Sequence, residues 1–179
     1  MIQNLKLKER ENSCKLFLNL DTHVNSEKTL EYLCWVVNAD VLYDFALKTY
    51  DFELVIMVAK HTQKDPKEYL PYLKKLQEMD PILMKFQINY DLKYYEEALS
   101  ELGTGQEKYF EKCLQVIEKH QLYEYSLKLF CKNENCFYKI WQIYASYLES
   151  QAKFYEAGYA YLESNDFDKS LQCFTVIYY

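Results

Sequence analysis

The cysteines and histidines are the residues best suited to metal or nucleophilic chemistry, and the chain has 6 Cys and 3 His. The strongest metal candidate is the pair Cys131 and Cys136, with Cys113 and His120 upstream. Structural zinc sites usually combine two close pairs of ligands. The second pair is missing here, and the upstream candidates fall in expected helices. We therefore expect no metal site, and we interpret the cysteines as buried free thiols.

Covalent and acid–base catalysis find equally little support. A cysteine nucleophile needs a neighbouring base and a lowered thiol pKa, and the spacing of His23, His61 and His120 indicates no such pair. Adjacent carboxylates such as Glu96 and Glu97 face different directions on a helix, so they do not form a catalytic dyad. The sequence thus predicts no catalytic, cofactor-binding or metal-binding residue, no cofactor and no enzyme.

The 19 tyrosines could stack on nucleic-acid bases, but the charge of the chain argues against that role. The net charge is −6, Arg10 is the single arginine among 21 basic residues, and the longest basic run is Lys74-Lys75. Nucleic-acid affinity depends largely on basic side chains that neutralise phosphates. We expect no tight nucleic-acid binding by this segment, and we assign the tyrosines to core and interface packing.

The elements that position these residues are predicted to be helices. Only 3 Gly and 3 Pro occur in 179 residues, which argues against a β-rich fold with many tight turns and against a phosphate-binding loop. Helix start signals recur at Ser26, Asp51, Asp65-Pro66 and Asp80-Pro81, and Glu68 would complete a capping box with Asp65.

Two segments need a decision between alternatives. The apolar run Leu54–Ala59 could be a buried strand, but the Asp51 cap and the helical patterns on both sides favour a buried helix. Pro71 lies early in the helix that begins at Pro66, so we expect a mild kink rather than a break. Gly103-Thr104-Gly105 is expected to separate two helices. Further helices are expected at residues 82–90, 93–102, 107–119, 122–131, 136–151, 154–164 and 167–178.

A five-residue pattern recurs along the chain: aromatic, acidic, any residue, small, apolar. Its five copies begin at Tyr43, Tyr95, Tyr123, Tyr155 and Phe167, each at an expected helix start. The helix dipole favours an acidic residue in the first turn, and a small residue lets helices approach closely. Because some copies lie about 30 residues apart, we predict an all-α fold, an α-solenoid of antiparallel, tetratricopeptide-like helix pairs.

The chain resembles the helical region of the Elongator complex protein 1 family, the largest subunit of the Elongator complex. The resemblance covers residues 30–174, is strongest over 30–76, and does not clearly cover residues 1–25. The run Gln-Lys-Asp-Pro-Lys-Glu-Tyr-Leu-Pro at residues 63–71 is its specific part, and the segments at 95–99, 122–124 and 154–158 follow in the family's order.

The resemblance implies a non-catalytic scaffold within a complex that modifies wobble uridines of tRNA. The implied partners are other Elongator subunits, including the catalytic subunit, which is a different chain with radical-SAM and acetyltransferase-like domains. The family's β-propellers, dimerisation region and basic tail are not attributed to this chain. No catalytic residue is transferred, and no partner-binding residue is named.

We divide the chain into an amino-terminal segment of uncertain structure at residues 1–25 and a partial α-solenoid at residues 26–179. The solenoid is expected to be truncated, because residues 173–179 are mostly apolar and contain no Gly or Asn stop signal. The alternative function is a generic tetratricopeptide-type adaptor that binds peptides. A carboxylate-binding version would need several Lys or Arg on one inner face, and the sequence shows no such set.

The longest apolar runs, at residues 33–37 and 54–59, are far shorter than the roughly 18 residues of a membrane span. No signal peptide is apparent either, so we expect no membrane partner and reduced cysteines. The expected location is the cytoplasm, with a nuclear pool left open.

Overall fold

The computed structural model describes residues 37–178, which are helical with no strand among them. This confirms the predicted helical solenoid class. The contacts divide the chain after Met79 into two compact units, which we call unit 1 and unit 2. No helix in the described residues is both long and apolar enough to cross a membrane. Ser26 lies outside the described residues, and the proposed division at residues 25 and 26 stays a prediction.

The described helices of unit 1 are α3 Ala39–Lys48, α4 Phe52–His61 and α5 Pro66–Gln77. Two of the three, α4 and α5, begin at side-chain caps that the sequence predicts, whereas α3 is capped by Asn38, which was not predicted as a cap. Asp51 accepts hydrogen bonds from the backbone N–H groups of Glu53 and Leu54, at 3.0 and 3.2 Å. Asp65 accepts from the N–H of Lys67 at 2.9 Å. These bonds satisfy backbone donors that have no partner within the helix.

The two uncertain segments of unit 1 are both helical. The apolar run Leu54–Ala59 lies within α4, with Val55 and Ala59 fully buried, so the helix interpretation is confirmed. Helix α5 continues through Pro71 without a break. Its capping box is half formed, because no hydrogen bond in the described part of the chain joins the Glu68 carboxylate to the Asp65 backbone.

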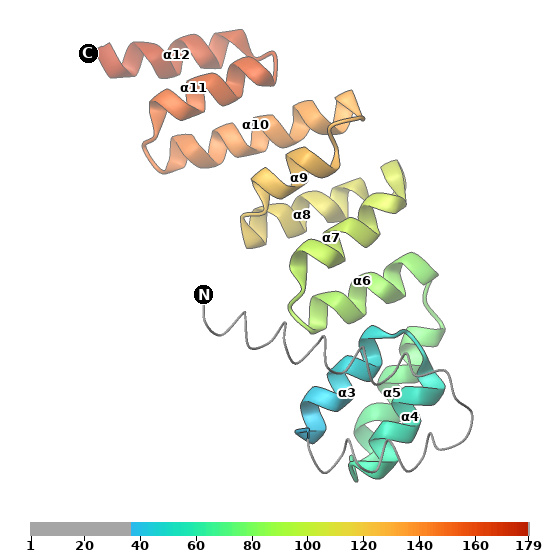
Figure 1. The fold of residues 1–179 in the computed structure, drawn as a ribbon. Helices are drawn as coiled ribbons and strands as arrows, with labels where there is room; N and C mark the ends of the chain where they lie inside the picture. The colour runs from blue at the N-terminus through green and yellow to red at the C-terminus, as the bar shows by residue number, and fades with distance from the viewer. Residues whose placement is uncertain (1–36, 179) are drawn as a thin grey trace. The chain divides into compact units, whose positions relative to one another are not determined.

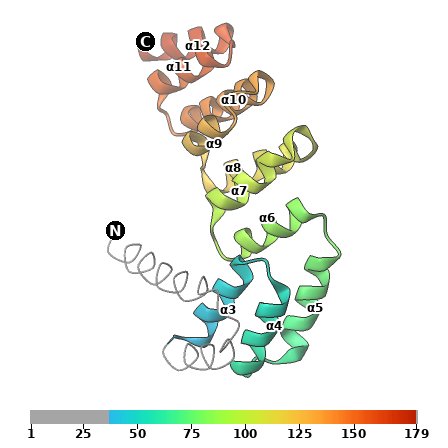
Figure 2. The same ribbon diagram turned by 45° about the vertical axis from the view of Figure 1, so that its right-hand side comes forward.

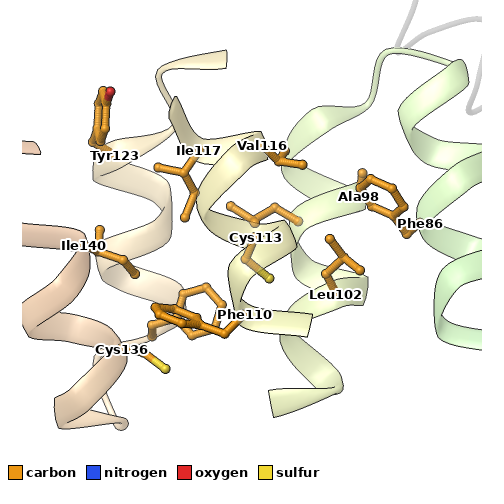
Figure 3. Packing of buried hydrophobic residues seen from close by; sticks show 12 residues of the cluster. Phe86, Ala98, Leu102, Phe110, Cys113, Val116, Ile117, Tyr123, Cys136 and Ile140 are labelled. Atoms are coloured by element: carbon orange, nitrogen blue, oxygen red, sulfur yellow. The ribbon is translucent and has the colours of Figure 1, made fainter. Parts of the chain in front are cut away.

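Unit 2 is a series of helices in which each packs against the next, antiparallel to it (Figures 1 and 2). The elements are α6 Pro81–Asp91, α7 Tyr95–Thr104, the 3-10 helix η1 Gln106–Tyr109, α8 Phe110–His120, α9 Tyr123–Leu129, α10 Glu134–Ser150, α11 Phe154–Glu163 and α12 Phe167–Tyr178. A core of buried side chains joins α6 to α10, and Figure 3 shows it from close by. It includes Phe86, Leu102, Phe110, Ile117 and Ile140. A second buried cluster joins α10 to α11 and α12.

The predicted break at Gly103-Thr104-Gly105 is wrong in its position, because α7 continues to Thr104. Gly103 instead lies at a tight helix contact, where a Cβ atom would lie 3.2 Å from Cδ2 of Leu129 on α9. The start of α10 also differs from the prediction. Asn133 caps this helix by accepting from the N–H of Cys136 at 3.3 Å, so α10 begins at Glu134 rather than at residue 136.

The small position of the recurring pattern is buried in all five copies, as close helix packing requires. The five residues are Ala46, Ala98, Ser126, Gly158 and Ser170.

Four of the five acidic residues lie in the first turn of a helix, but the copy that begins at Tyr43 is an exception. Helix α3 begins at Ala39, so Asp44 lies beyond the first turn and the prediction is wrong for this copy. Partial desolvation raises the pKa of the Asp44 carboxyl, although the residue is exposed at the surface.

Helix ends in this chain use the left-handed conformation without glycine. The six residues with positive φ are Tyr50, Gln63, Lys93, Gln121, Ala152 and Asn165, and no glycine in the described part of the chain has positive φ. At most of these helix ends, the backbone N–H of the residue after the left-handed one donates to a carbonyl of the last helical turn. An example is the 3.0 Å hydrogen bond from Lys153 N–H to Leu148 C=O. This is the Schellman arrangement, which usually employs glycine.

We expect Ala152→Gly to stabilise the chain by about 1 kcal/mol. Ala152 has a φ of 58°, and a Cβ atom in the left-handed region costs roughly that much relative to glycine. The measurement is the urea midpoint followed by circular dichroism. Asn165→Gly is the matched control and should gain less, because asparagine tolerates this conformation. An unchanged midpoint for Ala152→Gly would show that the turn relaxes around its methyl group.

Candidate interaction surface

The cysteines of the metal candidate do not converge with a histidine. Cys113 and Cys136 are buried and Cys131 is exposed, so the expectation of buried thiols is wrong for Cys131. Burial raises the pKa of the Cys113 thiol to about 12 and also raises that of Cys136. Both thiols are therefore protonated near neutral pH and serve as apolar packing groups. No group of three or more His, Cys, Asp or Glu side chains that could hold a metal occurs in residues 37–178.

His120 belongs to an aromatic cluster rather than to a metal site. Its ring stacks on Tyr95, with centroids 3.6 Å apart, and lies edge-on to Tyr90 at 5.4 Å. The Tyr90 hydroxyl accepts from Nζ of Lys119 at 2.8 Å and lies 3.1 Å from Nε2 of His120. A hydroxyl that accepts from lysine can donate to Nε2 only when His120 is neutral. The cluster thus joins the ends of α6 and α8 to the start of α7.

This arrangement predicts that stability falls as the pH drops below the ordinary histidine range. Burial, with the neighbouring Lys119 charge, lowers the pKa of His120 in the folded state. The unfolded chain therefore takes up the proton first, near pH 6.5, and the stability present above that value is lost below it. We expect His120→Gln to reduce the shift of the urea midpoint between about pH 7.5 and about pH 5.5. Equal shifts for variant and wild type would contradict this assignment.

A similar aromatic contact recurs in the next two helix pairs. The first residue of the recurring pattern contacts aromatic rings from the carboxyl-terminal half of the following helix. On α9, Tyr123 stacks on Tyr144 and Tyr147 of α10, with centroids 4.9 Å apart in both cases. On α11, Tyr155 meets Phe174 of α12 edge-on at 6.1 Å. The sequence pattern identified the first partner of each contact, whereas the second carries no local signal.

The tyrosines therefore divide into two groups. Tyr43, Tyr69, Tyr123 and Tyr161 are buried, in agreement with a packing role, while several others lie on the surface. The most deeply buried, Tyr161, donates to the Glu149 carboxylate at 2.8 Å.

An open groove of about 520 Å³ lies beside one of these tyrosine stacks. Its lining comes from Glu118, Tyr123, Gln142, Ile143, Ser146, Tyr147 and Lys169. Lys169 is the one basic residue of this lining, and it forms an ion pair with Asp166 at 3.4 Å. The lining therefore has mixed charge, and it does not provide the set of basic residues that a carboxylate-binding groove needs.

The two units correspond to two known family models. Residues 4–76 match the model described as the ELP1 alpha-solenoid, and residues 83–176 match the ELP1 TPR domain. The chain belongs to the Elongator complex protein 1 family. The first match begins at residue 4, so family similarity extends into the segment that the resemblance left uncovered. The boundary between the matches falls at residues 77–82, close to the division after Met79.

Curated Elongator complex protein 1 relatives from distant organisms match over most of the chain. A putative elongator complex protein 1 of Xenopus laevis is 38% identical over 153 residues, which is 86% of this chain and 13% of the relative. The Drosophila melanogaster protein is 37% identical over 146 residues, 82% of this chain and 12% of its own length. The Saccharomyces cerevisiae protein is 34% identical over 149 residues, which is 82% of this chain and 11% of the relative. The chain thus spans 11–13% of the length of these relatives.

Proposed function

We propose that this chain is a scaffold segment of an Elongator complex and has no catalytic role of its own. In this proposal it holds and positions other subunits, including the catalytic subunit, for the modification of tRNA wobble uridines in the cytoplasm. The observation that carries the proposal is the tandem match of both helical family models across the two units.

The chemistry of the described side chains supports a structural role. The Cys113 thiol is held protonated, and His120 is engaged with Tyr90 and Tyr95. Glu96 and Glu97 are exposed on the first turn of α7, where the helix dipole favours acidic side chains. These groups are accounted for by packing and solvation.

A chimera tests the scaffold function directly. In yeast cells that lack their own Elongator complex protein 1, the matching 149 residues of the Saccharomyces cerevisiae protein would be replaced by this chain. We expect the catalytic subunit to co-purify with the chimera and wobble-uridine modification to be restored, as measured by mass spectrometry of tRNA. The matched control carries Leu102→Asp, which places a charge in the core and unfolds the segment. Full co-purification and full modification with that control would overturn the proposal.

We also predict that the purified chain does not bind tRNA tightly. Residues 80–179 contain 10 Lys against 15 Asp and Glu, for a net charge of −5. Several of these lysines are engaged within the fold: Lys112 lies 4.4 Å from the centre of the Phe86 ring, and Lys108 pairs with Asp80 at 3.2 Å. A gel shift at about 0.15 M salt should show no complex below about 1 µM chain. Sub-micromolar binding that weakens steeply with salt would contradict the prediction.

A further inference from the structure

The open groove that Tyr123 and Tyr147 line lies within the helix series of unit 2. Most of its lining comes from α10, and the rest comes from α8 and α9, which precede that helix, and from the first turn of α12. Helices on both sides of α10 in the series therefore shape the groove. Its volume of about 520 Å³ falls in the range of cavities that bind ligands. We call it the tyrosine groove.

The aromatic rings of the tyrosine groove are held in place by packing. Tyr147 stacks on Tyr123 with centroids 4.9 Å apart, and its hydroxyl donates to Oε1 of Gln121 at 3.1 Å. Tyr123 stacks in turn on Tyr144, also at 4.9 Å. Tyr147 is only half-buried, and its ring lines the groove. An aromatic ring fixed in this way offers a ligand an apolar surface whose face attracts cations.

The carboxylate of Glu118 dominates the charge of the tyrosine groove. Lys169 carries the opposite charge, but its Nζ pairs with Asp166 at 3.4 Å and lies 5.3 Å from the centre of the Tyr161 ring. Glu118 is exposed, and no ion pair joins it to any other residue in the range 37–178. Burial raises the pKa of Tyr123, and the negative charge of Glu118 raises it further. A carboxylate and an aromatic ring thus line one groove, and both attract cations.

A guanidinium group fits this combination better than an ammonium group or a metal ion does. Guanidinium is planar, stacks on tyrosine, and donates a fork of N–H groups that matches a carboxylate. Gln142 and Ser146 also line the groove, and their side-chain oxygens are further acceptors. An ammonium group is more strongly hydrated and cannot stack in this way. A hard metal ion needs several oxygen ligands with charge, and the lining offers one carboxylate.

We propose that the tyrosine groove binds an arginine side chain of a partner protein. The guanidinium stacks on the Tyr147 ring, and its N–H groups donate to the Glu118 carboxylate. The rest of the groove takes the neighbouring residues of the same partner segment. The inference rests on the proposed scaffold function and deepens it by stating the chemistry of one partner contact. Its test uses this chain alone, so its failure would leave the result of the chimera experiment standing.

Three short synthetic peptides test the proposal. They share a Gly-Ser background and differ in one central residue, which is arginine, lysine or citrulline, the uncharged analogue of arginine. NMR titration of the isotope-labelled 179-residue chain measures their affinities. We expect the arginine peptide to bind at least about tenfold more tightly than the citrulline peptide and at least about threefold more tightly than the lysine peptide. The preference over citrulline should shrink between about 0.15 M and about 0.5 M salt.

Substitutions of charged residues locate the binding site. Glu118→Gln should weaken binding of the arginine peptide at least about fivefold and bring its affinity close to that of the citrulline peptide. The matched control is Glu96→Gln, which removes the same charge from an exposed position of α7 outside the groove. It should change the affinity by no more than about twofold. Lys169→Gln should tighten binding, because it removes a like charge from the lining.

Substitutions of Tyr147 test the stacking contact. Tyr147→Leu should weaken binding of the arginine peptide at least about threefold, because it removes the ring and keeps an apolar side chain. Tyr147→Phe keeps the ring and should retain the affinity. Thermal melting followed by circular dichroism confirms that each variant is folded, and the conclusions from Glu118→Gln and Tyr147→Phe do not depend on the leucine variant.

Any one of three results would overturn the proposal. The first is the absence of chemical-shift changes with the arginine peptide at about 1 mM. The second is an affinity for the lysine or the citrulline peptide equal to that for the arginine peptide. The third is an equal loss of binding with Glu118→Gln and Glu96→Gln, because it would assign the interaction to the net charge of the chain.

Discussion

Leu102→Ala is expected to destabilise the chain by about 3 kcal/mol. Leu102 is fully buried in the core that joins α6 to α10, together with Ile117 and Ile140 (Figure 3). Truncation removes three buried carbon atoms. The loss of stability therefore includes the hydrophobic free energy that their burial contributed and the cost of the cavity left behind. Gly103 is the next residue on α7 and already allows α9 to come close, which limits how far the helices can collapse into the cavity.

Urea unfolding followed by circular dichroism measures this loss. The matched control is Leu171→Ala, which removes the same atoms from a side chain that is 66% exposed, and it should change the stability by no more than about 0.5 kcal/mol. A loss below about 1 kcal/mol at Leu102 would mean that the core relaxes around the cavity.

The features that the sequence predicted well are local ones. Asp65 and Asp80 cap helices through bonds to backbone groups two residues away, at 2.9 and 3.0 Å. Such bonds depend only on residue type and on the following turn, so the Asp-Pro signals were sufficient. The burial of the small position in the recurring pattern also follows from local spacing.

The features that were missed depend on residues far apart in the chain. Gly103 was interpreted as a helix stop, but α7 continues through it, and its closest neighbour is Leu129 on α9. The stacking of His120 on Tyr95 joins residues on different helices, and neither residue type requires the other. Residue type also misleads at helix ends, because Gln121 and Ala152 take the left-handed conformation that glycine usually fills.

The candidate site was less predictable than the fold, for a related reason. The sequence named no partner-binding residue, because an exposed tyrosine and a buried one look alike in a helical pattern. Tyr123 and Tyr155 begin copies of the same pattern, yet their exposures are 5% and 59%. Two rings of α10 stack on Tyr123, whereas one ring of α12 meets Tyr155 edge-on, and such contacts between helices are not visible in the local pattern.

Ala98→Leu is expected to destabilise the chain by about 2 to 3 kcal/mol. Ala98 is fully buried at the small position of the recurring pattern, in the same core cluster as Phe86 (Figure 3). Leucine adds three carbon atoms where α7 packs against α6, and a close-packed interior has no space for them. The strain should exceed any gain from the larger apolar side chain, so the urea midpoint should fall.

The control for this substitution is Gln115→Leu, which introduces leucine at an exposed position of α8. Since leucine and glutamine have similar helix propensities, the free energy of unfolding of this variant should change by no more than about 0.5 kcal/mol. A neutral or stabilising effect of Ala98→Leu would show that unfilled space remains beside the small residue. In that case close approach of the helices would not be the reason that the pattern places a small residue at its fourth position.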